Sequence, residues 1–445
     1  MKDNNISSNE AFNQKVETDL LAHLIADKKK FNFFLSILIA IILVGIFAYY
    51  RQVRYGLIVT SMRDYTSWGI YISNFVFLVA ISLVGSLFSA ILKLAKVPWS
   101  TPLTRISEII AIGAIICASV IIIVDMGRPD RFIYVVIHGR IQSPIIWDVI
   151  IISTYLTISL LLLYISLIPD LAICRDKLTD VVGWKKWFYR VFSINWKGTP
   201  EQYKLLHKIS YILAVIVIPV AFAIHTVTSW LFSTTWRPGW DSTNLGPYFV
   251  SGALMAGAAI IIVAMYFIRN TLNLKEYLTD KLFDHMGKLL VLLSLVYLYF
   301  NINEYLGPAF KMVGVEGEHI IELFFGAYAP MYWIVQIFGL ILPIVILIFA
   351  WGRKPLPMLI ISILVLLGAW FKRFLIVIPS LQHPYLPIQD VQDSYRHYIP
   401  SWEEWAITFA SFAGCLLIIT FLIRLLPVIP IWEIQKENEE KLQES

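Results

Sequence analysis

The sequence has 445 residues, of which 58% are hydrophobic and only 15% are charged, and its mean hydropathy is +0.70. This composition excludes an intrinsically disordered chain and argues strongly against a water-soluble enzyme. The formal net charge of +5 is too small over this length to indicate a nucleic-acid partner. The three cysteines lie far apart without a Cys-x-x-Cys pair, so the sequence indicates neither a disulfide framework nor a cysteine-ligated cluster.

Ten apolar runs are each long enough to cross the roughly 30 Å hydrocarbon core of a bilayer as a helix. We therefore expect an all-α integral membrane protein with about ten transmembrane helices. The charged segment before the first run, residues 1–32, does not look like a cleavable signal peptide. The expected spans are Phe33–Tyr50, Trp68–Leu92, Ile106–Val124, Ile145–Ile168, Ile209–Ser229, Val250–Phe267, Leu289–Tyr305, Met331–Trp351, Leu356–Pro379 and Trp405–Leu426.

The distribution of Lys and Arg predicts the orientation of these spans. With ten spans both termini share a side, and the tails and even-numbered connections carry 25 of the 36 Lys and Arg residues. Because cytoplasmic connections are the basic ones, we expect both termini in the cytoplasm of a prokaryote, with the chain in its inner membrane. The connections that contain Arg128 to Arg140, Trp236 to Tyr248, Leu306 to Pro330 and Gln382 to Trp402 should then face outward.

Ionisable residues gather where the third span ends and the fourth begins. Asp125 ends the third span and Asp148 opens the fourth, and the connection between them contains Arg128, Arg131 and His138. A carboxylate near the interface with a histidine at hand could accept the two protons released when a quinol is oxidised. The structural alternative is that the two arginines only pair with nearby aspartates and cap the helices. In the same way, Asp148 could be simply the cap of the fourth span.

The fifth span ends with a second candidate, His225, about one turn inside the outward interface. The connection that follows it contains Trp240 and Asp241 among several aromatic residues. A histidine at this depth needs a partner, which could be a purely structural hydrogen bond, and the aromatic residues could form an interfacial belt. We favour a pocket in which these aromatic rings pack against an aromatic head group. Tyr134 of the preceding connection and Trp147 of the fourth span would belong to the same pocket.

A polar stripe runs along the seventh span. Ser294, Tyr297, Asn301 and Glu304 are spaced three, four and three residues apart and so lie on one helical face. A stripe that ends in a carboxylate could carry protons part-way across the membrane. Hydrogen bonds between helices are the more ordinary explanation of the same pattern.

The histidines argue against a membrane cytochrome b. Such a protein needs pairs of histidines on facing helices at matched depth, and six of the eight histidines fall in tails, connections or span edges. The other two, His207 and His225, are 18 residues apart in one segment, about 27 Å along a helix, and cannot ligate one haem. We therefore expect neither haem nor a metal ion on this chain, so that any redox metals belong to partners.

Several short segments together resemble one family of membrane proteins. They are Gly127-Arg-Pro-Asp130, Ser143-Pro-Ile-Ile-Trp-Asp148, His225-Thr-Val-Thr-Ser-Trp-Leu-Phe232, Pro238-Gly-Trp240, Gly246-Pro-Tyr-Phe249, Trp402-Glu-Glu-Trp405-Ala-Ile-Thr408 and Ile429-Pro-Ile-Trp-Glu433. In this order the segments resemble the NrfD/PsrC family of quinone-interacting membrane subunits, and most closely the ActC subunits of alternative complex III. One difference is that Asp125 stands just before Gly-Arg-Pro, where those subunits commonly have histidine.

The resemblance implies an architecture and a quinone site. It implies two four-helix bundles, spans two to five and six to nine, flanked by the first and last helices. The divisions would be 1–32, an N-terminal cytoplasmic segment; 33–229, the first helix and first bundle; 230–379, the second bundle; and 380–445, the last connection, helix and tail. The first bundle would bind the quinone near the outward face, through Asp148, Asp125, His225 and Asp241.

The resemblance also implies the partners and the reaction. Electrons would pass between menaquinone or ubiquinone and an extracytoplasmic iron–sulfur subunit, with proton translocation as an open possibility. Further membrane subunits, a homologous NrfD-like one among them, and cytochrome c-type subunits would complete the complex. One alternative is the membrane anchor of a polysulfide-, thiosulfate- or nitrite-reductase-type molybdenum or haem complex. Another is a secondary transporter, which the sequence disfavours because it lacks paired Gly/Pro-interrupted spans.

Overall fold

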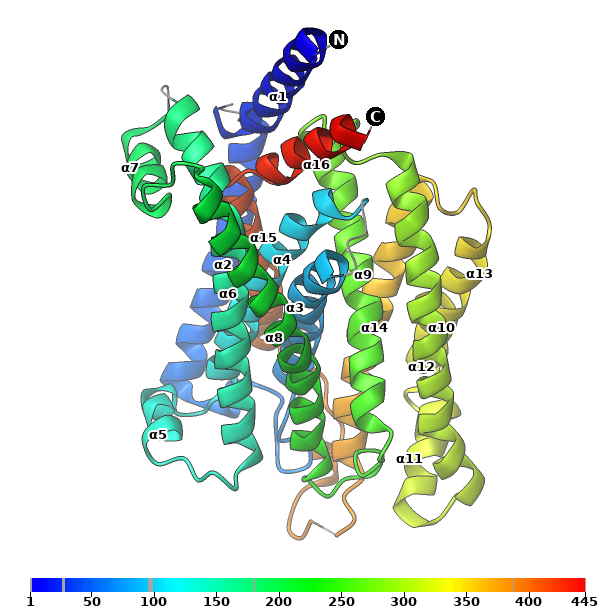
Figure 1. Cartoon of the computed structure of the whole chain (residues 1–445). Helices are drawn as coiled ribbons and strands as arrows, with labels where there is room; N and C mark the ends of the chain where they lie inside the picture. Colours follow the sequence, from blue (N-terminus) through cyan, green and yellow to red (C-terminus); the bar gives the residue numbers. More distant parts are fainter. Residues whose placement is uncertain (1, 26–28, 95–98, 179–180, 387, 445) are drawn as a thin grey trace.

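The computed structural model describes residues 2–25, 29–94, 99–178, 181–386 and 388–444, and this part of the chain is helical apart from its connections (Figure 1). Ten of the described helices are long and apolar enough to cross a membrane, which confirms the predicted fold class. These spans are α2 (Lys29–Tyr55), α3 (Ile70–Leu94), α4 (Thr101–Asp125), α6 (Pro144–Lys177), α8 (Pro200–Ser233), α9 (Leu245–Thr271), α10 (Asp280–Lys311), the eighth span 329–348, α14 (Pro355–Gln382) and α15 (Trp402–Leu425). Outside the spans, the structure has the helices α1 (Lys2–Ile25), α5 (Phe132–Ile137), α7 (Gly183–Phe192), α11 (Gly314–Phe324) and α16 (Ile431–Glu444).

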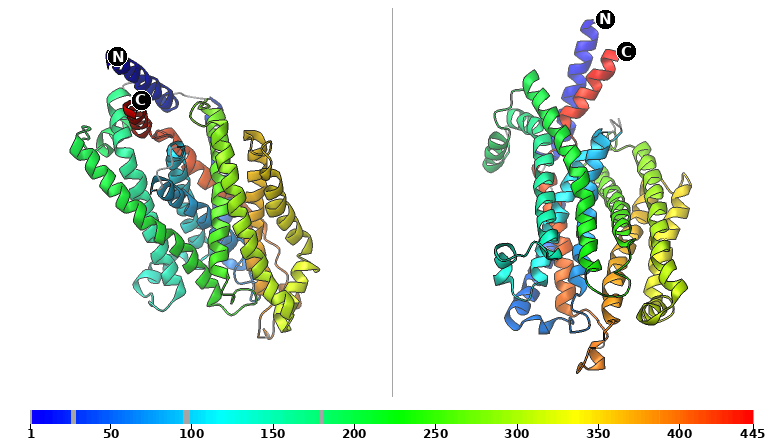
Figure 2. Two further views of the ribbon diagram at one scale, coloured as in Figure 1. Left: turned by 45° about the vertical axis from the view of Figure 1, so that its right-hand side comes forward. Right: turned by 60° about the horizontal axis from the view of Figure 1, so that its bottom comes forward.

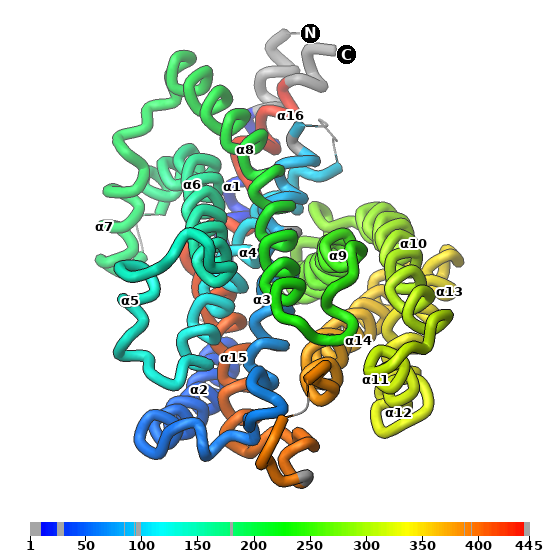
Figure 3. The backbone as a smooth tube through the Cα atoms, turned by 90° about the horizontal axis from the view of Figure 1, so that it is seen from below, coloured from blue at the N-terminus to red at the C-terminus, as the bar shows by residue number. Residues whose placement is uncertain are grey.

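Both termini lie at the same end of the bundle (Figures 1 and 2). We call this end the terminal face and the opposite end, which carries α5 and α11, the distal face. Viewed from the distal face, α10 lies to one side and α2, α6 and α15 lie to the other, with α3 and α9 between them (Figure 3). Helix α3 contacts α4 and α8 as well as α9 and α14, while α2 packs against α15. The division of the chain at residues 229 and 379 stays a prediction.

The eighth span is not the continuous helix that we predict over Met331–Trp351. It consists of α12 (Ala329–Gln336), a π-helical segment (Ile337–Ile341) and α13 (Leu342–Ile348), so it also ends earlier than predicted. Pro343 explains the irregularity, because it has no N–H to donate to the carbonyl four residues back, at Gly339. At this point Gly339 lies against Gly368 of α14, where an added Cβ would come within 2.7 Å of the facing Cα.

The fourth and fifth spans are longer than predicted. Helices α6 and α8 have 34 residues each, about 51 Å, which exceeds the roughly 30 Å hydrocarbon core. Helix α8 begins with a capping box in which Thr199 accepts a hydrogen bond from the backbone of Gln202. The hydropathy signal marks only the apolar middle of each helix, so the polar ends beyond the hydrocarbon fall within the predicted connections.

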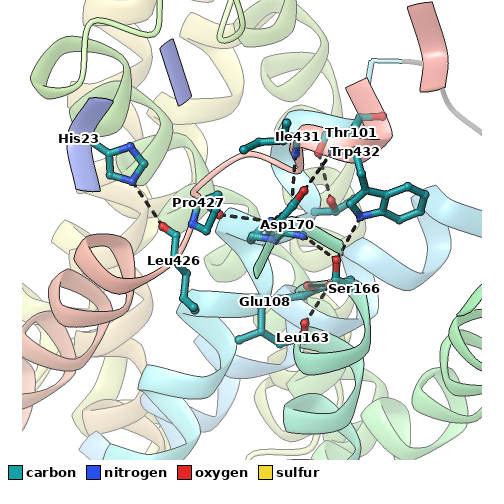
Figure 4. Close-up of polar contacts among 12 residues, drawn as sticks. His23, Thr101, Glu108, Leu163, Ser166, Asp170, Leu426, Pro427, Ile431 and Trp432 are labelled. Carbon is teal, nitrogen blue, oxygen red and sulfur yellow. Dashed lines mark hydrogen bonds and ion pairs between the residues drawn. The ribbon is translucent and has the colours of Figure 1, made fainter. Parts of the chain in front are cut away.

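A buried polar network ties the C-terminal helix to the terminal face (Figure 4). Asp170 of α6 pairs with Arg105 of α4, and both side chains are fully buried. The Asp170 carboxylate also accepts hydrogen bonds from the backbone N–H groups of Ile431 (3.3 Å) and Trp432 (3.0 Å), at the start of α16. The tail beyond Trp432 therefore begins as a packed helix rather than as a solvated end. Arg105, counted among the connection residues in predicting orientation, lies inside α4.

The closest approach of α3 and α4 depends on Gly85. A Cβ at this position would lie 2.1 Å from the carbonyl oxygen of Ser107 and 2.5 Å from the Cβ of Ala111. We expect Gly85→Val to force the helices apart and to lower the stability of the protein by about 1–3 kcal/mol, measured as a lower melting temperature in detergent. Gly307→Val on α10 is the control, because no atom of the described residues lies within 4 Å of its added Cβ. Equal melting temperatures for the two variants would contradict this packing.

Candidate functional site

Asp148 faces α8 from the first turns of α6. Its side chain is only 4% exposed, and Oδ1 accepts a hydrogen bond from the Thr228 hydroxyl at 2.8 Å. Helix α6 begins at Pro144 with Ser143 as its N-cap residue, so Asp148 lies past the cap. The alternative in which this carboxylate caps the fourth span is therefore wrong. A buried carboxylate with a hydroxyl partner can hold or release a proton without losing that partner.

His225 lies on α8 three residues before Thr228, and both side chains are buried. It is 2% exposed, and neither ring nitrogen has a hydrogen-bond partner among the described residues. The purely structural hydrogen bond expected as the alternative for His225 is therefore not found within this part of the chain. Arg373 of α14 lies close enough to act electrostatically on the ring. Asp148 and His225 thus lie on two contacting helices, and the α8 side chain that meets Asp148 is Thr228, three residues from His225.

Asp125 ends α4 at the distal face, the same end at which Asp148 opens α6, but it faces different helices. One carboxylate oxygen is buried with no hydrogen-bond partner among the described residues, and Glu404 of α15 acts on it electrostatically. The adjoining carbonyl of Val124 accepts a hydrogen bond from Gln52 of α2 at 2.7 Å. Asp125 therefore belongs to the contact of α4 with α2 and α15 rather than to the surroundings of Asp148.

The connection between these aspartates lies on the surface. Arg128 pairs with Asp130 at 3.2 Å, and both side chains are about 60% exposed or more. His138, Arg131 and Tyr134 are also exposed, and the rings of His138 and Tyr134 lie 5.3 Å apart. The pairing of Arg128 with Asp130 is the structural alternative that the sequence leaves open. The structure thus places this connection apart from the buried Asp148 and His225.

The tryptophans of the predicted pocket lie in two environments. Trp147 is partly buried and packs edge-on against Trp230, with ring centroids 6.4 Å apart. Trp240 is fully buried, stacks on Trp68 at 5.7 Å, and donates a hydrogen bond to the carbonyl of Ile376 at 2.8 Å. Trp240 is thus part of the core that joins α8 to α14, rather than a free aromatic wall.

Asp241 lies at a groove on the other side of α8. The groove lies between α8, α9 and α10, measures about 710 Å³, and has Phe222, Trp230 and Phe300 in its lining. This volume is in the range of small-molecule sites, and the lining is mostly apolar. The residues of the predicted quinone pocket are therefore distributed over two buried polar side chains on α6 and α8, an exposed connection and an apolar groove.

The polar stripe of α10 is buried and hydrogen-bonded in part. The Tyr297 hydroxyl donates to that of Tyr248 (3.1 Å), which donates to Asn301 (2.9 Å), and Glu304 accepts from Asn244 (3.0 Å). These are hydrogen bonds between α9 and α10, as expected if the stripe serves to hold helices together. Ser294, also buried, has no hydrogen-bond partner within the described ranges.

Two buried cations beside this stripe were missed from the sequence. Lys372 and Arg373 of α14 are 2% and 4% exposed, and both lie inside the predicted span Leu356–Pro379. Lys372 donates to the Tyr305 hydroxyl at 2.7 Å and interacts electrostatically with Glu304. The available signal was two adjacent charges within an apolar run, which in a membrane span is a functional indication by default.

The fold and these groups define a multi-pass integral membrane protein with buried titratable residues in two places. It belongs to the NrfD family, because the family model described as "Polysulphide reductase, NrfD" matches residues 58–384. The chain is 24% identical over 407 residues to a selenate reductase subunit of Mesobacillus selenatarsenatis, covering 89% of this chain and 94% of that one. It is 22% identical over 399 residues to the menaquinone reductase integral membrane subunit of Nitratidesulfovibrio vulgaris, covering 87% of this chain and 89% of that one. It is 31% identical over 230 residues to a putative dimethyl sulfoxide reductase membrane subunit of Halobacterium salinarum, covering 52% of this chain and 50% of that one.

Proposed function

We propose that this chain is the quinone-binding membrane subunit of a respiratory oxidoreductase complex, and that it passes electrons between the quinone pool and an extracytoplasmic iron–sulfur partner. The observation that carries the proposal is a buried carboxylate, Asp148 of α6, on a helix that contacts α8, where the ring nitrogens of buried His225 have no partner among the described residues. Membership of the NrfD family supports it, as does the relative named as a menaquinone reductase subunit. The quinone would be menaquinone or ubiquinone.

In the proposed chemistry, this chain takes up the protons of a quinol and its partner takes up the electrons. Oxidation of one quinol releases two electrons and two protons. Asp148 accepts one hydroxyl proton, His225 accepts the other, and both electrons leave to the iron–sulfur partner. The apolar groove beside α8 would give the quinone tail access from the lipid. Arg128, Arg131, Tyr134 and His138, which lie on the distal surface, would contact the partner rather than the head group.

The orientation and the assembly are part of the same proposal. The distal face would be extracytoplasmic and both termini cytoplasmic in a prokaryotic inner membrane, as the Lys and Arg distribution favours. Partners would include further membrane subunits, such as a homologous NrfD-like one, and cytochrome c-type subunits. The ActC-like segments favour alternative complex III as the assembly. Haem and metal ions would be bound by these partners.

A second candidate is the anchor of a molybdenum reductase. It is favoured by the relatives named as subunits of selenate and dimethyl sulfoxide reductases. Electrons would then run from quinol to that enzyme. A secondary transporter is less well supported, because α6, which by order corresponds to the interrupted eighth span, is a continuous helix.

Purification of the tagged chain from its native membrane tests the proposal. We expect an iron–sulfur subunit to copurify and the preparation to oxidise a menaquinol analogue with an artificial electron acceptor. A molybdenum enzyme in the same preparation would select the second candidate. A chain that purifies alone, without quinol oxidation but with a bound solute, would contradict both and support transport.

A further inference from the structure

A small cavity begins where the polar stripe of α10 ends. Its lining includes Glu304 of α10, Glu316 and His319 of α11, and Ser380 of α14, and its volume is about 30 Å³. A water molecule needs about 10–15 Å³ and two to four polar partners, so the cavity has room for about two waters. The cavity therefore connects the buried carboxyl of Glu304 to the side chains of the distal face.

His319 forms the distal wall of this cavity. It is 5% exposed, and its Nδ1 has no hydrogen-bond partner among the residues that the structure describes. Burial, and to a smaller extent the charge of His383, lowers the pKa of His319 to about 3, so the ring is neutral at ordinary pH. A neutral imidazole has one donor and one acceptor nitrogen and can take a proton on one side while releasing one on the other.

Beyond His319 a second histidine reaches the surface. The rings of His319 and His383 lie 5.7 Å apart, and His383 Nε2 lies 2.7 Å from Glu322. The side chains of His383 and Glu322 are 14% and 23% exposed. Burial alone would lower the pKa of His383, but the bonds to Glu322 and to the carbonyl of Pro379 outweigh it and raise the pKa.

We propose that Glu304, the cavity, His319 and the His383–Glu322 pair form the outward opening of a proton pathway. The inference rests on the proposed function, which supplies the proton-coupled redox reaction. A proton leaves the Glu304 carboxyl for a cavity water, passes to His319, and moves from there to the His383–Glu322 pair and the external water. The Glu304 carboxyl then regains a proton from the α10 stripe, so no charge accumulates in the pathway.

The charged surroundings of the pathway are compatible with this role. The other charged groups that act on its members are Lys372, Asp241, Glu318 and His397. Arg373 acts on Lys372, and Glu316 lies in the cavity wall. Glu316 accepts a hydrogen bond from Tyr385 at 3.2 Å, which joins the base of α11 to the connection after α14. The structural alternative is that the same histidines only fasten α11 to α14.

His319→Gln in the intact complex tests the proposal. The complex is reconstituted in liposomes, and menaquinol-analogue oxidation and proton release on the distal side are measured together. We expect proton release beyond that supplied by the quinol to fall at least about tenfold, while oxidation with an uncoupler stays within about twofold. Ser380→Val, which narrows the cavity, should have the same effect. His285→Gln is the matched control, because His285 also has a buried Nδ1 without a partner in the described residues but lies at the opposite end of α10.

Glu322→Gln provides a readout that fastening alone would not change. Loss of the carboxylate lowers the pKa of His383, so the pH profile of proton release should shift to lower pH. Normal proton release by His319→Gln and Ser380→Val, or an unshifted profile for Glu322→Gln, would overturn the pathway while leaving the proposed function intact. A native complex that oxidises quinol but releases only the quinol's own protons would overturn the pathway as well. No quinol oxidation by the native complex would overturn the proposed function itself.

Discussion

Asp148→Asn is expected to lower quinol oxidation by at least about tenfold while the complex still assembles. Asparagine keeps the size of the side chain and can still accept the hydrogen bond from Thr228, but it cannot take up a proton. Positioned general bases typically contribute about 10²–10⁴-fold to a rate, so the loss should exceed any effect of altered packing. The measurement is quinol oxidation by the purified complex, normalised to the amount of this chain.

Asp130→Asn is the matched control for that substitution. Asp130 lies at the same distal face, but it is exposed and pairs with Arg128. Its removal should leave quinol oxidation nearly unchanged, because exposed ion pairs contribute little. Near-normal turnover by an assembled Asp148→Asn complex would remove Asp148 as the proton acceptor.

Asp170→Asn is expected to destabilise the protein by about 3–5 kcal/mol. The substitution leaves the Arg105 guanidinium buried without its counter-charge, and breaking a buried ion pair by removing one partner has a cost of this size. It also weakens the acceptor of the two N–H groups at the start of α16. We expect a lower melting temperature in detergent and faster proteolysis of residues 431–444.

Asp176→Asn on the same helix separates this effect from a general loss of charge. Asp176 pairs with Arg175 at 2.7 Å, but its side chain is 60% exposed. The stability should therefore change by no more than about 1 kcal/mol. If both variants melt at the temperature of the unchanged protein, the buried network does not hold α16 in place.

The spans could be predicted because the physical signal for them is strong and local. Apolar runs of about twenty residues fix where a chain crosses a bilayer. Asp148 and His225 could be placed toward the distal ends of two contacting helices because each occurs at that end of an expected span and consecutive spans tend to be neighbours. The same reasoning does not say which helices Asp125 faces, because a position at a helix end leaves the direction of the side chain open.

Other features of the fold and site depend on pairings that no local pattern encodes. Arg105 meets Asp170 across 65 positions of sequence, and His319 meets His383 from a short helix that hydropathy does not detect. Lys372 lies inside the predicted span Leu356–Pro379, which contains no acidic residue to pair with it. Its ammonium is instead accommodated by Tyr305 and Tyr332, whose ring centroids lie 4.4 and 5.0 Å away.

The central claim is that this chain binds a quinone beside Asp148 and His225, and photoaffinity labelling of the intact complex tests it most directly. A photoreactive menaquinone analogue, irradiated in the native membrane and mapped by mass spectrometry, should label the start of α6 and the distal part of α8, 144–148 and 222–233. Excess menaquinone should abolish the labelling. Labelling confined to other subunits, or to the helix ends at the terminal face of this chain, would contradict the claim.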